Sequence, residues 1–309
     1  MSVTAMELTM GESSHIDTDG NGYSSTLGDG AGGYQTSTSG STAYCQPGAG
    51  AGHGGAGGDS EQTTTGGSQY GSMVTPTAYG SGGGKGRAYL SSNTRAGGSG
   101  GGKVHITLDG VLQMSSGSKI SANGDAGTAG GSFNYWSCSY SSQYSRATEP
   151  GGGGSGGSIL LEVGNMDGSG VVEVKGGQGG DQASVGCSNC YGEAGGGGAG
   201  GRIAVNASNA TLSAMSSITF DASAGASGSS GAKVGGAGTV YLQRGSHREL
   251  RVDNAPNTDL TGGVVDLPGS AVGVSSLVLD QVTLHNVHGS MSSMAGFVVS
   301  SMQMDDSDL

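Results

Sequence analysis

A stretch of alternating acidic and amide residues has the spacing of a calcium-binding loop. Asp17, Asp19 and Asn21 occupy the first, third and fifth positions of such a loop, and a glycine follows them. Oxygen ligands at alternate positions suit Ca²⁺, but Gly28 stands where the loop needs its bidentate glutamate. These residues are weak calcium candidates, and a strand that ends in an Asp-Gly or Asn-Gly turn is the simpler explanation.

Four cysteines lie in segments rich in glycine, serine or tyrosine: Cys45, Cys138, Cys187 and Cys190. The Cys-Ser-Asn-Cys spacing of the last two resembles a redox motif or half of a zinc site. No second Cys or His pair completes a zinc set, and no βαβ pattern surrounds the motif. We expect structural disulfides, for which four cysteines allow three connectivities that the sequence does not distinguish.

Acidic side chains on predicted strands are candidates for polysaccharide cleavage, which needs carboxylates brought together by the fold. The carboxylates on which a lyase or hydrolase would depend are Asp17, Asp19, Glu162, Glu173 and Asp221.

The glycine run before Lys103 fails as a phosphate loop, because Val104 stands where Ser or Thr must hold magnesium. Overall we expect no catalytic residue, no cofactor and no enzymatic activity.

Two further groups of residues bear on surface chemistry. Tyr135, Trp136 and Tyr140 lie in one glycine-rich excursion, and such side chains suit contacts with sugars or surfaces. Asn206 and Asn209 begin two adjacent N-glycosylation sequons. Together with the even number of cysteines, the sequons favour an oxidising, extracellular location.

The composition excludes several classes of protein. Glycine supplies 68 of 309 residues, charged residues are 12%, and the net charge is −12. The 12 Lys and Arg are scattered, which argues against nucleic acid as a partner. No apolar run is long enough to span a membrane, and no signal peptide is visible, so a secreted protein would be present here as a mature or excised piece.

A repeated pattern of strands indicates the fold. Each copy has a glycine run, an alternating apolar strand, a short turn and a second strand. The first strands are anchored by Val104, Ile159, Ile203 and Val240, and the excursion between copies varies in length. Alternation puts Val, Ile and Leu on one face, so stacked copies would form parallel sheets. We predict an all-β fold of the parallel β-helix or solenoid type, built from stacked strand pairs.

The glycine-rich excursions allow two interpretations. They are flexible linkers, or they are extended segments packed in the manner of polyproline II or polyglycine II, with glycine present because neighbouring chains approach closely. We favour packing, because the runs recur before every first strand and because excursions carry aromatic residues and cysteines.

The chain divides into two parts by composition. Residues 1–254 carry the glycine-rich repeats, whereas residues 255–309 have less glycine and more Val, Leu and Met. We expect the second part to hold further strands that act as a cap or connector, followed by a solvated acidic tail.

The strings Gly-Gly-Ser-Gly-Gly-Ser-Ile, Ile-Ser-Ala-Asn-Gly and Gly-Ala-Gly-Thr-Val-Tyr-Leu resemble a glycine-rich repeat of large extracellular proteins of protists, algae and some bacteria. Proteins similar to mastigoneme components, the hair-like fibres of algal flagella, are among them. The resemblance covers residues 5–254 and implies a large secreted glycoprotein without catalytic residues.

These observations predict a structural subunit of an extracellular filament or cell-surface appendage. Its expected partners are further copies of itself or other fibre proteins, together with attached glycans. The alternative is an adhesin that binds glycans or surfaces through its tyrosine- and tryptophan-rich loops, and a polysaccharide lyase or hydrolase is a third hypothesis.

Overall fold

The computed structural model describes residues 1–34, 46–61, 64–87, 94–131, 149–182, 193–210, 215–229, 231–257, 265–267, 277–285, 289–291, 297–305 and 307. Throughout these ranges the ordered secondary structure is β, with no helix, and most strand pairs are parallel. The prediction of an all-β protein with parallel sheets is confirmed at this level.

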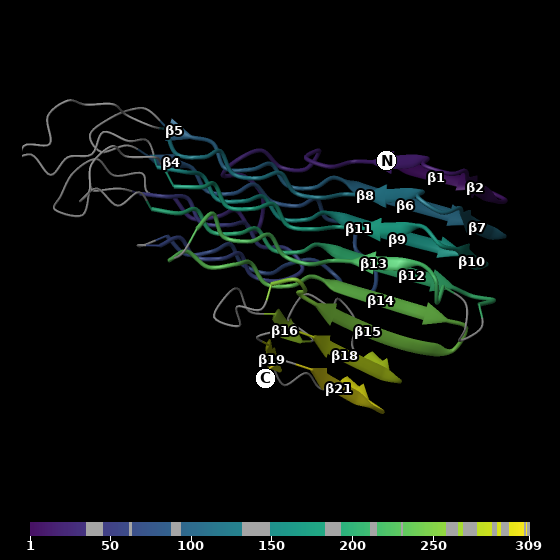
Figure 1. Cartoon of the computed structure of the whole chain (residues 1–309). Helices are drawn as coiled ribbons and strands as arrows, with labels where there is room; N and C mark the ends of the chain where they lie inside the picture. Colours follow the sequence, from purple (N-terminus) through teal and green to yellow (C-terminus); the bar gives the residue numbers. More distant parts are fainter. Residues whose placement is uncertain are drawn as a thin grey trace, which may run out of the picture.

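One eight-stranded main sheet runs through the molecule, from β1 to β21 (Figure 1). In order, its strands are β1 (Ser2–Ala5), β6 (Lys103–Leu108), β9 (Ser158–Val163), β12 (Arg202–Ala207), β14 (Thr239–Arg244), β15 (His247–Asp253), β18 (Gln281–His285) and β21 (Met302–Asp305).

Two smaller parallel sheets accompany the first half of the main sheet. The second sheet comprises β2 (Leu8–Met10), β7 (Val111–Met114) and β10 (Asn165–Gly168). The third comprises β3 (His15–Asp17), β8 (Lys119–Ser121), β11 (Val171–Glu173) and β13 (Thr219–Asp221). The remaining described pairs are β4 (Gly86–Arg87) with β5 (Thr94–Arg95), β16 (Val265–Leu267) with β19 (Gly289–Met291), and β17 (Leu277–Leu279) with β20 (Phe297–Val299).

The strand anchors stack in register. Val104 lies opposite Ile159, Ile159 opposite Ile203, and Ile203 opposite Val240. Because side chains alternate along a strand, the next inward positions form a second row one step further on. All of these side chains belong to one buried core between the sheets.

The prediction of strand pairs was wrong for the first three units, because each of them contains three strands. The segment between the two predicted strands is itself a strand: Leu112 of β7 pairs in register with Leu8 of β2 and Met166 of β10. Three or four residues are too short to show clear periodicity, so the sequence pattern resembled a turn.

A hairpin ends the first series of units. Residues 249–254 have the alternation expected of a second strand of the repeat, but β15 pairs antiparallel with β14 in the main sheet. Gly245, with a φ of +57°, sits in the two-residue turn between them and supplies the left-handed conformation that such a turn requires. The chain direction is therefore reversed beyond this point.

The reversal moves the core to the other face of the main sheet. Val240 and Leu242 of β14 face the first core, whereas Tyr241 joins a second core with Leu250 and Val252 of β15. Beyond the hairpin, β18 pairs parallel with β15 and β21 with β18. The pairs β16–β19 and β17–β20 are also parallel. Successive segments therefore continue to stack beyond the hairpin, with strands that run antiparallel to those of the first series.

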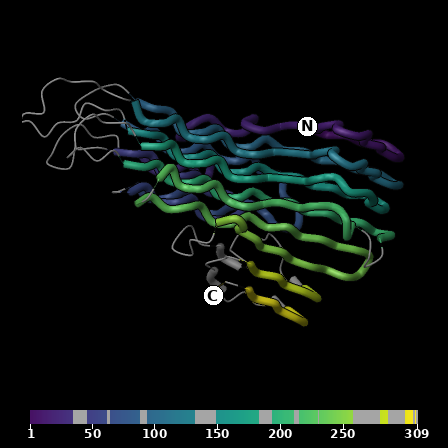
Figure 2. The backbone as a smooth tube through the Cα atoms, in the orientation of Figure 1, coloured from purple at the N-terminus to yellow at the C-terminus, as the bar shows by residue number. Residues whose placement is uncertain are grey.

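The glycine-rich segments extend from the strands as a layered array. Figures 1 and 2 show them running side by side with the same stacking order as the sheets. This arrangement places backbone against backbone over most of their length.

Candidate functional site: a packed glycine bundle

The glycine-rich array is the largest feature of the molecule that the sheets do not explain. We call it the glycine bundle and define it by residues 18–33, 46–60, 78–86, 96–102, 122–130, 150–157, 174–180, 193–201, 222–228 and 233–238. Most of its glycines are buried, although these segments form no regular strand apart from Gly86 at the start of β4. Their backbone groups must therefore be paired within the bundle.

Residues 152–157 show how this pairing works, because their amides donate in three directions in turn. Gly152 donates to Gly84 O, Gly153 to Gly196 O and Gly154 to Asp125 O, at 2.9 to 3.0 Å. The next three residues repeat the sequence on the same three neighbouring segments: the acceptors are the carbonyl oxygens of Ser81, Ala199 and Ala122.

This period of three distinguishes the bundle from a sheet. In a β-strand, backbone groups alternate between two sides, and each strand has at most two partners in its sheet. A helix with three residues per turn points successive amides toward three neighbours. Each interior segment of the bundle therefore has hydrogen-bonded neighbours on three sides, whereas a strand has them on two.

Residues 195–201 have the same period. Gly195, Gly198 and Gly201 donate to one segment, at the carbonyls of residues 180, 177 and 174. Gly196 and Ala199 donate to the segment 46–60, whereas Gly197 and Gly200 donate to the segment 233–238. Two successive units thus obey one pairing rule.

Glycine is required here by the close approach of neighbouring backbones. A Cβ atom on Gly198 would overlap the backbone of Gly154, and a Cβ atom on Gly153 would overlap that of Gly177. The obstructing atoms belong to main chain, so no change of side-chain rotamer relieves the overlap. The linker interpretation is therefore wrong for the described parts of the excursions.

The first long excursion adds a further layer to the bundle. Ala51 N donates to Gly153 O, and Gly58 N donates to Gly197 O, each at 2.9 Å. Gly84 O and Ser81 O accept from residues 152 and 155. Residues 46–60 and 78–86 therefore cover the segments that lead into β9 and β12.

A buried polar cluster joins this added layer to the main sheet. His53 and Arg202 are almost completely buried. His53 Nδ1 lies 2.7 Å from Gly156 O, and its ring stacks on Tyr70 with 4.5 Å between centroids. Arg202 donates from Nε to Tyr70 O and from Nη1 to Thr239 Oγ1, so the guanidinium links residues that are far apart in the sequence.

The electrostatics of the cluster keep His53 neutral. Burial, and secondarily the charge of Arg202, lowers the pKa of His53 to about 3. Because a carbonyl only accepts, Nδ1 carries the proton, and Nε2 is a buried acceptor without a hydrogen-bond partner. Burial also lowers the pKa of Arg202 to about 10, which leaves it charged at neutral pH.

A second polar cluster lies where the third sheet meets the bundle. Glu173 accepts from Lys119 and Lys175, each at 2.9 Å, and from Asn123 Nδ2 at 2.8 Å. Burial opposes ionisation of Glu173, but these three donors lower its pKa to about 2. The carboxylate is therefore committed to bridging β8 and β11, which leaves it poorly suited to proton transfer.

The calcium candidates belong to the same cluster. Asp17 Oδ1 accepts from Asp19 N at 2.8 Å, and both carboxylate oxygens of Asp19 accept from Asn123. Asn21 donates to Asp19 O. These contacts describe an Asx-type turn that is tied to the next unit. Across the described chain, no group of three or more His, Cys, Asp or Glu side chains could hold a metal ion.

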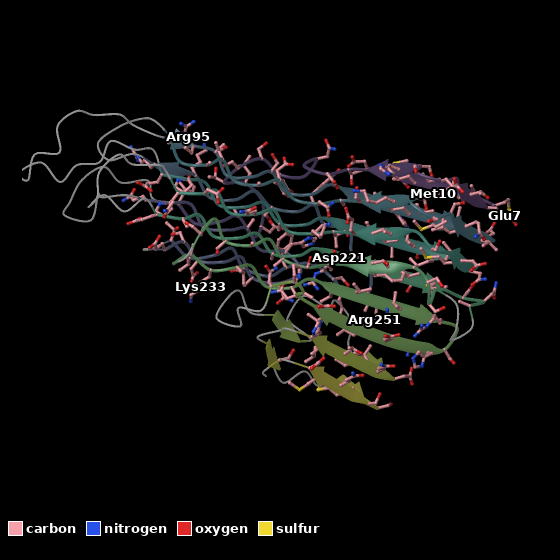
Figure 3. All side chains as sticks on the ribbon, viewed as in Figure 1. Glu7, Met10, Arg95, Asp221, Lys233 and Arg251 are labelled. Atoms are coloured by element: carbon pink, nitrogen blue, oxygen red, sulfur yellow. The ribbon has the colours of Figure 1, made fainter. Side chains whose placement is uncertain are left out.

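Four of the carboxylates considered for catalysis lie on strands of two sheets. Asp17, Glu173 and Asp221 share one register row of the third sheet, in which Ser121 separates the first two. Figure 3 shows Asp221 near the junction of strands and bundle. Glu162 lies on the main sheet and pairs with His105 at 2.7 Å.

The remaining predicted residues fall into two groups. Asn209 is exposed in the turn after β12, whereas Asn206 is half-buried within β12, opposite Glu162 and Gln243. The residues that lie outside the described ranges are Cys45, Cys138, Cys187, Cys190, Tyr135, Trp136 and Tyr140.

Sequence reasoning missed the buried cluster around His53 and Arg202. His53 was an isolated histidine among glycines, and Arg202 was the cationic residue that precedes one strand. Only the stacking of an excursion onto β12 brings them together. The available signal was an arginine at a position where the two flanking units carry Ser158 and Thr239.

Comparison with known proteins found no matching family model, curated protein or solved structure. In the part of the chain that the structure describes, no helix is long and apolar enough to cross a membrane.

Proposed function

We propose that the chain is a non-enzymatic structural subunit of an extracellular filament or surface appendage. Its units form coils of the β-helix type, and its excursions form a polyproline II-like bundle beside them. The observation that carries the proposal is the three-residue hydrogen-bond period of the glycine bundle.

The physical argument concerns stiffness. A segment that is hydrogen-bonded to three neighbours cannot bend without breaking contacts on several sides. The bundle and the sheets have the same stacking order, so they reinforce each other along one axis. Such a body suits load-bearing, and the sequons and cysteines favour an extracellular setting.

Electron microscopy and analytical ultracentrifugation of purified protein test this proposal. We expect elongated assemblies whose length increases with protein concentration. Monomers at every concentration would contradict it.

A second candidate function is adhesion, which a group of exposed tyrosines favours. Tyr23 and Tyr79 are 41% and 39% exposed, and their rings meet edge to face at 6.1 Å. Lys103 Nζ lies 4.6 Å from the centre of the Tyr79 ring. Aromatic rings with a nearby polar group suit contacts with sugars.

Glycan-array binding of a Tyr23→Ala/Tyr79→Ala variant tests adhesion, with Tyr34→Ala as the control because Tyr34 is similarly exposed. Loss of glycan binding in the double variant alone is the expected result. Equal binding by all three proteins would contradict this candidate.

A further inference from the structure

The two ends of the main sheet are open strand edges. Within the described residues, nothing pairs with the outer side of β1 or with that of β21. An unpaired edge presents a row of free backbone N–H and C=O groups to another strand. Figure 1 shows these edges at opposite ends of the sheet.

The outward backbone groups can be assigned to particular residues. Met1 donates to Lys103 O and accepts from His105 N, so its backbone faces β6. By alternation, Ser2 and Thr4 direct their backbone groups away from β6. Val282 N donates to Ser301 O, so the backbone groups of Met302 and Met304 are the outward ones on β21.

The side chains of these four residues lie on one face of the main sheet. Val3 packs against the first core, so Ser2 and Thr4 face the opposite side. Met302 and Met304 continue the rows of Val282 and Leu284, which belong to the second core on that same opposite side. The two methionines are 40% and 43% exposed.

The distribution of charge within the first unit indicates that β1, rather than β2 or β3, is the edge available for pairing. β1 carries no charged residue, whereas the adjoining part of the same unit exposes Glu7, Glu12 and Asp17. Charged side chains at a strand edge discourage pairing. Two copies that paired β1 with β1 would also bring these like charges together.

From this placement we infer that β21 of one copy pairs antiparallel with β1 of a second copy, with Met304 opposite Ser2 and Met302 opposite Thr4. In this register the outward backbone groups face each other and the side chains share a face. The junction repeats the antiparallel pairing of β14 with β15 that the chain itself contains.

The inference rests on the proposed filament and specifies its contact. Head-to-tail pairing is heterologous, so each added copy leaves one β1 edge and one β21 edge free, and growth continues. Pairing of like ends would instead stop at a dimer.

Two single-edge variants test the register. Thr4→Pro removes an outward donor from β1, and Met304→Pro removes one from β21. We expect each variant alone to sediment as a monomer, while an equimolar mixture forms a complex of twice the monomer mass. The mixture pairs the intact β21 of one variant with the intact β1 of the other.

Thr9→Pro is the matched control, because it makes the same change on β2. Ser115 N donates to Met10 O, so Thr9 directs its backbone away from β7, and its side chain is exposed. Assembly of this variant should equal that of the wild type. Loss of assembly in Thr9→Pro would overturn the assignment to β1.

The outcomes separate the inference from the proposed function. Assemblies that persist in Thr4→Pro or Met304→Pro would contradict the edge pairing but not the proposal that the protein forms a filament. A dimer of Met304→Pro alone indicates pairing of β1 with β1, and a dimer of Thr4→Pro alone indicates pairing of β21 with β21. Wild-type protein that is monomeric at every concentration overturns both.

Lysine substitutions guard against a folding defect. Thr4→Lys and Met304→Lys keep every backbone donor and add a charge to each edge. If a proline variant unfolds at a lower temperature than wild type, the lysine pair should reproduce the same pattern of monomers and mixed dimer. Normal assembly of the folded lysine variants would contradict the inference.

Discussion

The sheets and the glycine bundle use opposite means to hold neighbouring segments together. In the sheets, rows of side chains such as Ile159 and Ile203 fill a core, and the backbone pairs on two sides. In the bundle, side chains are small or absent, and the backbones of interior segments 152–157 and 195–201 pair on three sides. Side chains determine the distance between neighbouring layers in the sheets, whereas the absence of side chains permits the close approach of neighbouring backbones in the bundle.

The comparison shows where the molecule should tolerate change. A core position accepts another apolar side chain of similar volume, because neighbours can repack. An interior glycine of the bundle such as Gly153 or Gly198 accepts no side chain, because the obstructing atoms are backbone. Identical substitutions should therefore have very different effects in the two regions.

The largest expected effect follows a single methyl group added inside the bundle. Gly198→Ala places a Cβ against the backbone of Gly154, and separating the chains breaks hydrogen bonds on several sides. We expect a loss of about 4 kcal/mol in the free energy of unfolding, measured by denaturant titration.

Gly11→Ala is the matched control, since a Cβ there would meet no atom within 4 Å. Its effect should stay within about 0.5 kcal/mol. Equal effects at the two positions would show that the bundle is loosely packed.

Acid should weaken the contact between bundle and sheet. The pKa of His53 is about 3 in the folded protein, against 6.5 for an ordinary histidine, so the unfolded chain takes up the proton first. The stabilisation that comes from burying neutral His53 is complete above pH 6.5 and is lost as the pH falls toward 3. Between pH 6.5 and 4 we expect a loss of about 3 kcal/mol.

Urea unfolding at a series of pH values measures this slope. His53→Asn should flatten it between pH 6.5 and 4, because the titrating group is gone. His15→Asn, which changes an exposed histidine, should leave the slope as in wild type. An unchanged slope in His53→Asn would refute the assignment.

A smaller effect is expected at the polar cluster of the third sheet. Glu173→Gln removes the negative charge of the carboxylate that pairs with Lys119 and Lys175. We expect a loss of about 1 to 2 kcal/mol in the free energy of unfolding at pH 7. The pKa of Glu173 is lowered to about 2, so its contribution is complete above pH 4.5 and is lost as the pH falls toward 2.

Thermal unfolding at pH 7 and at pH 2 checks this prediction. The difference between Glu173→Gln and wild type should shrink at the lower pH. A difference that is the same at both values would mean that the charge of Glu173 contributes nothing.

The smallest effect is expected within the strand rows. Ile203→Val should cost about 1 kcal/mol, because valine already occupies the equivalent positions 104 and 240. Thermal unfolding measures the change. A loss as large as that of Gly198→Ala would remove the contrast between the two regions.

The sequence predicted the strand rows better than the spaces between them. Alternation located the anchors Val104, Ile159, Ile203 and Val240, and the structure places them in register. It did not reveal β7 and β10, because four residues carry too little periodicity. The hairpin at Gly245 was missed because its flanking strands resemble the repeat.

The bundle was beyond single-sequence reasoning for a physical reason. A glycine run has no side-chain pattern, so flexible and packed forms have the same sequence. The deciding contacts, such as that between Gly153 and Gly196, join separate units. The cluster of His53 with Arg202 depends on the same long-range stacking.

Amide hydrogen exchange tests the central claim most directly. If the bundle is packed, the amides of residues 152–157 and 195–201 should exchange as slowly as those of β9 and β12, because both sets open only with the folded body. Exchange of the glycine amides at the rate of an unstructured peptide, beside protected strands, would contradict the account.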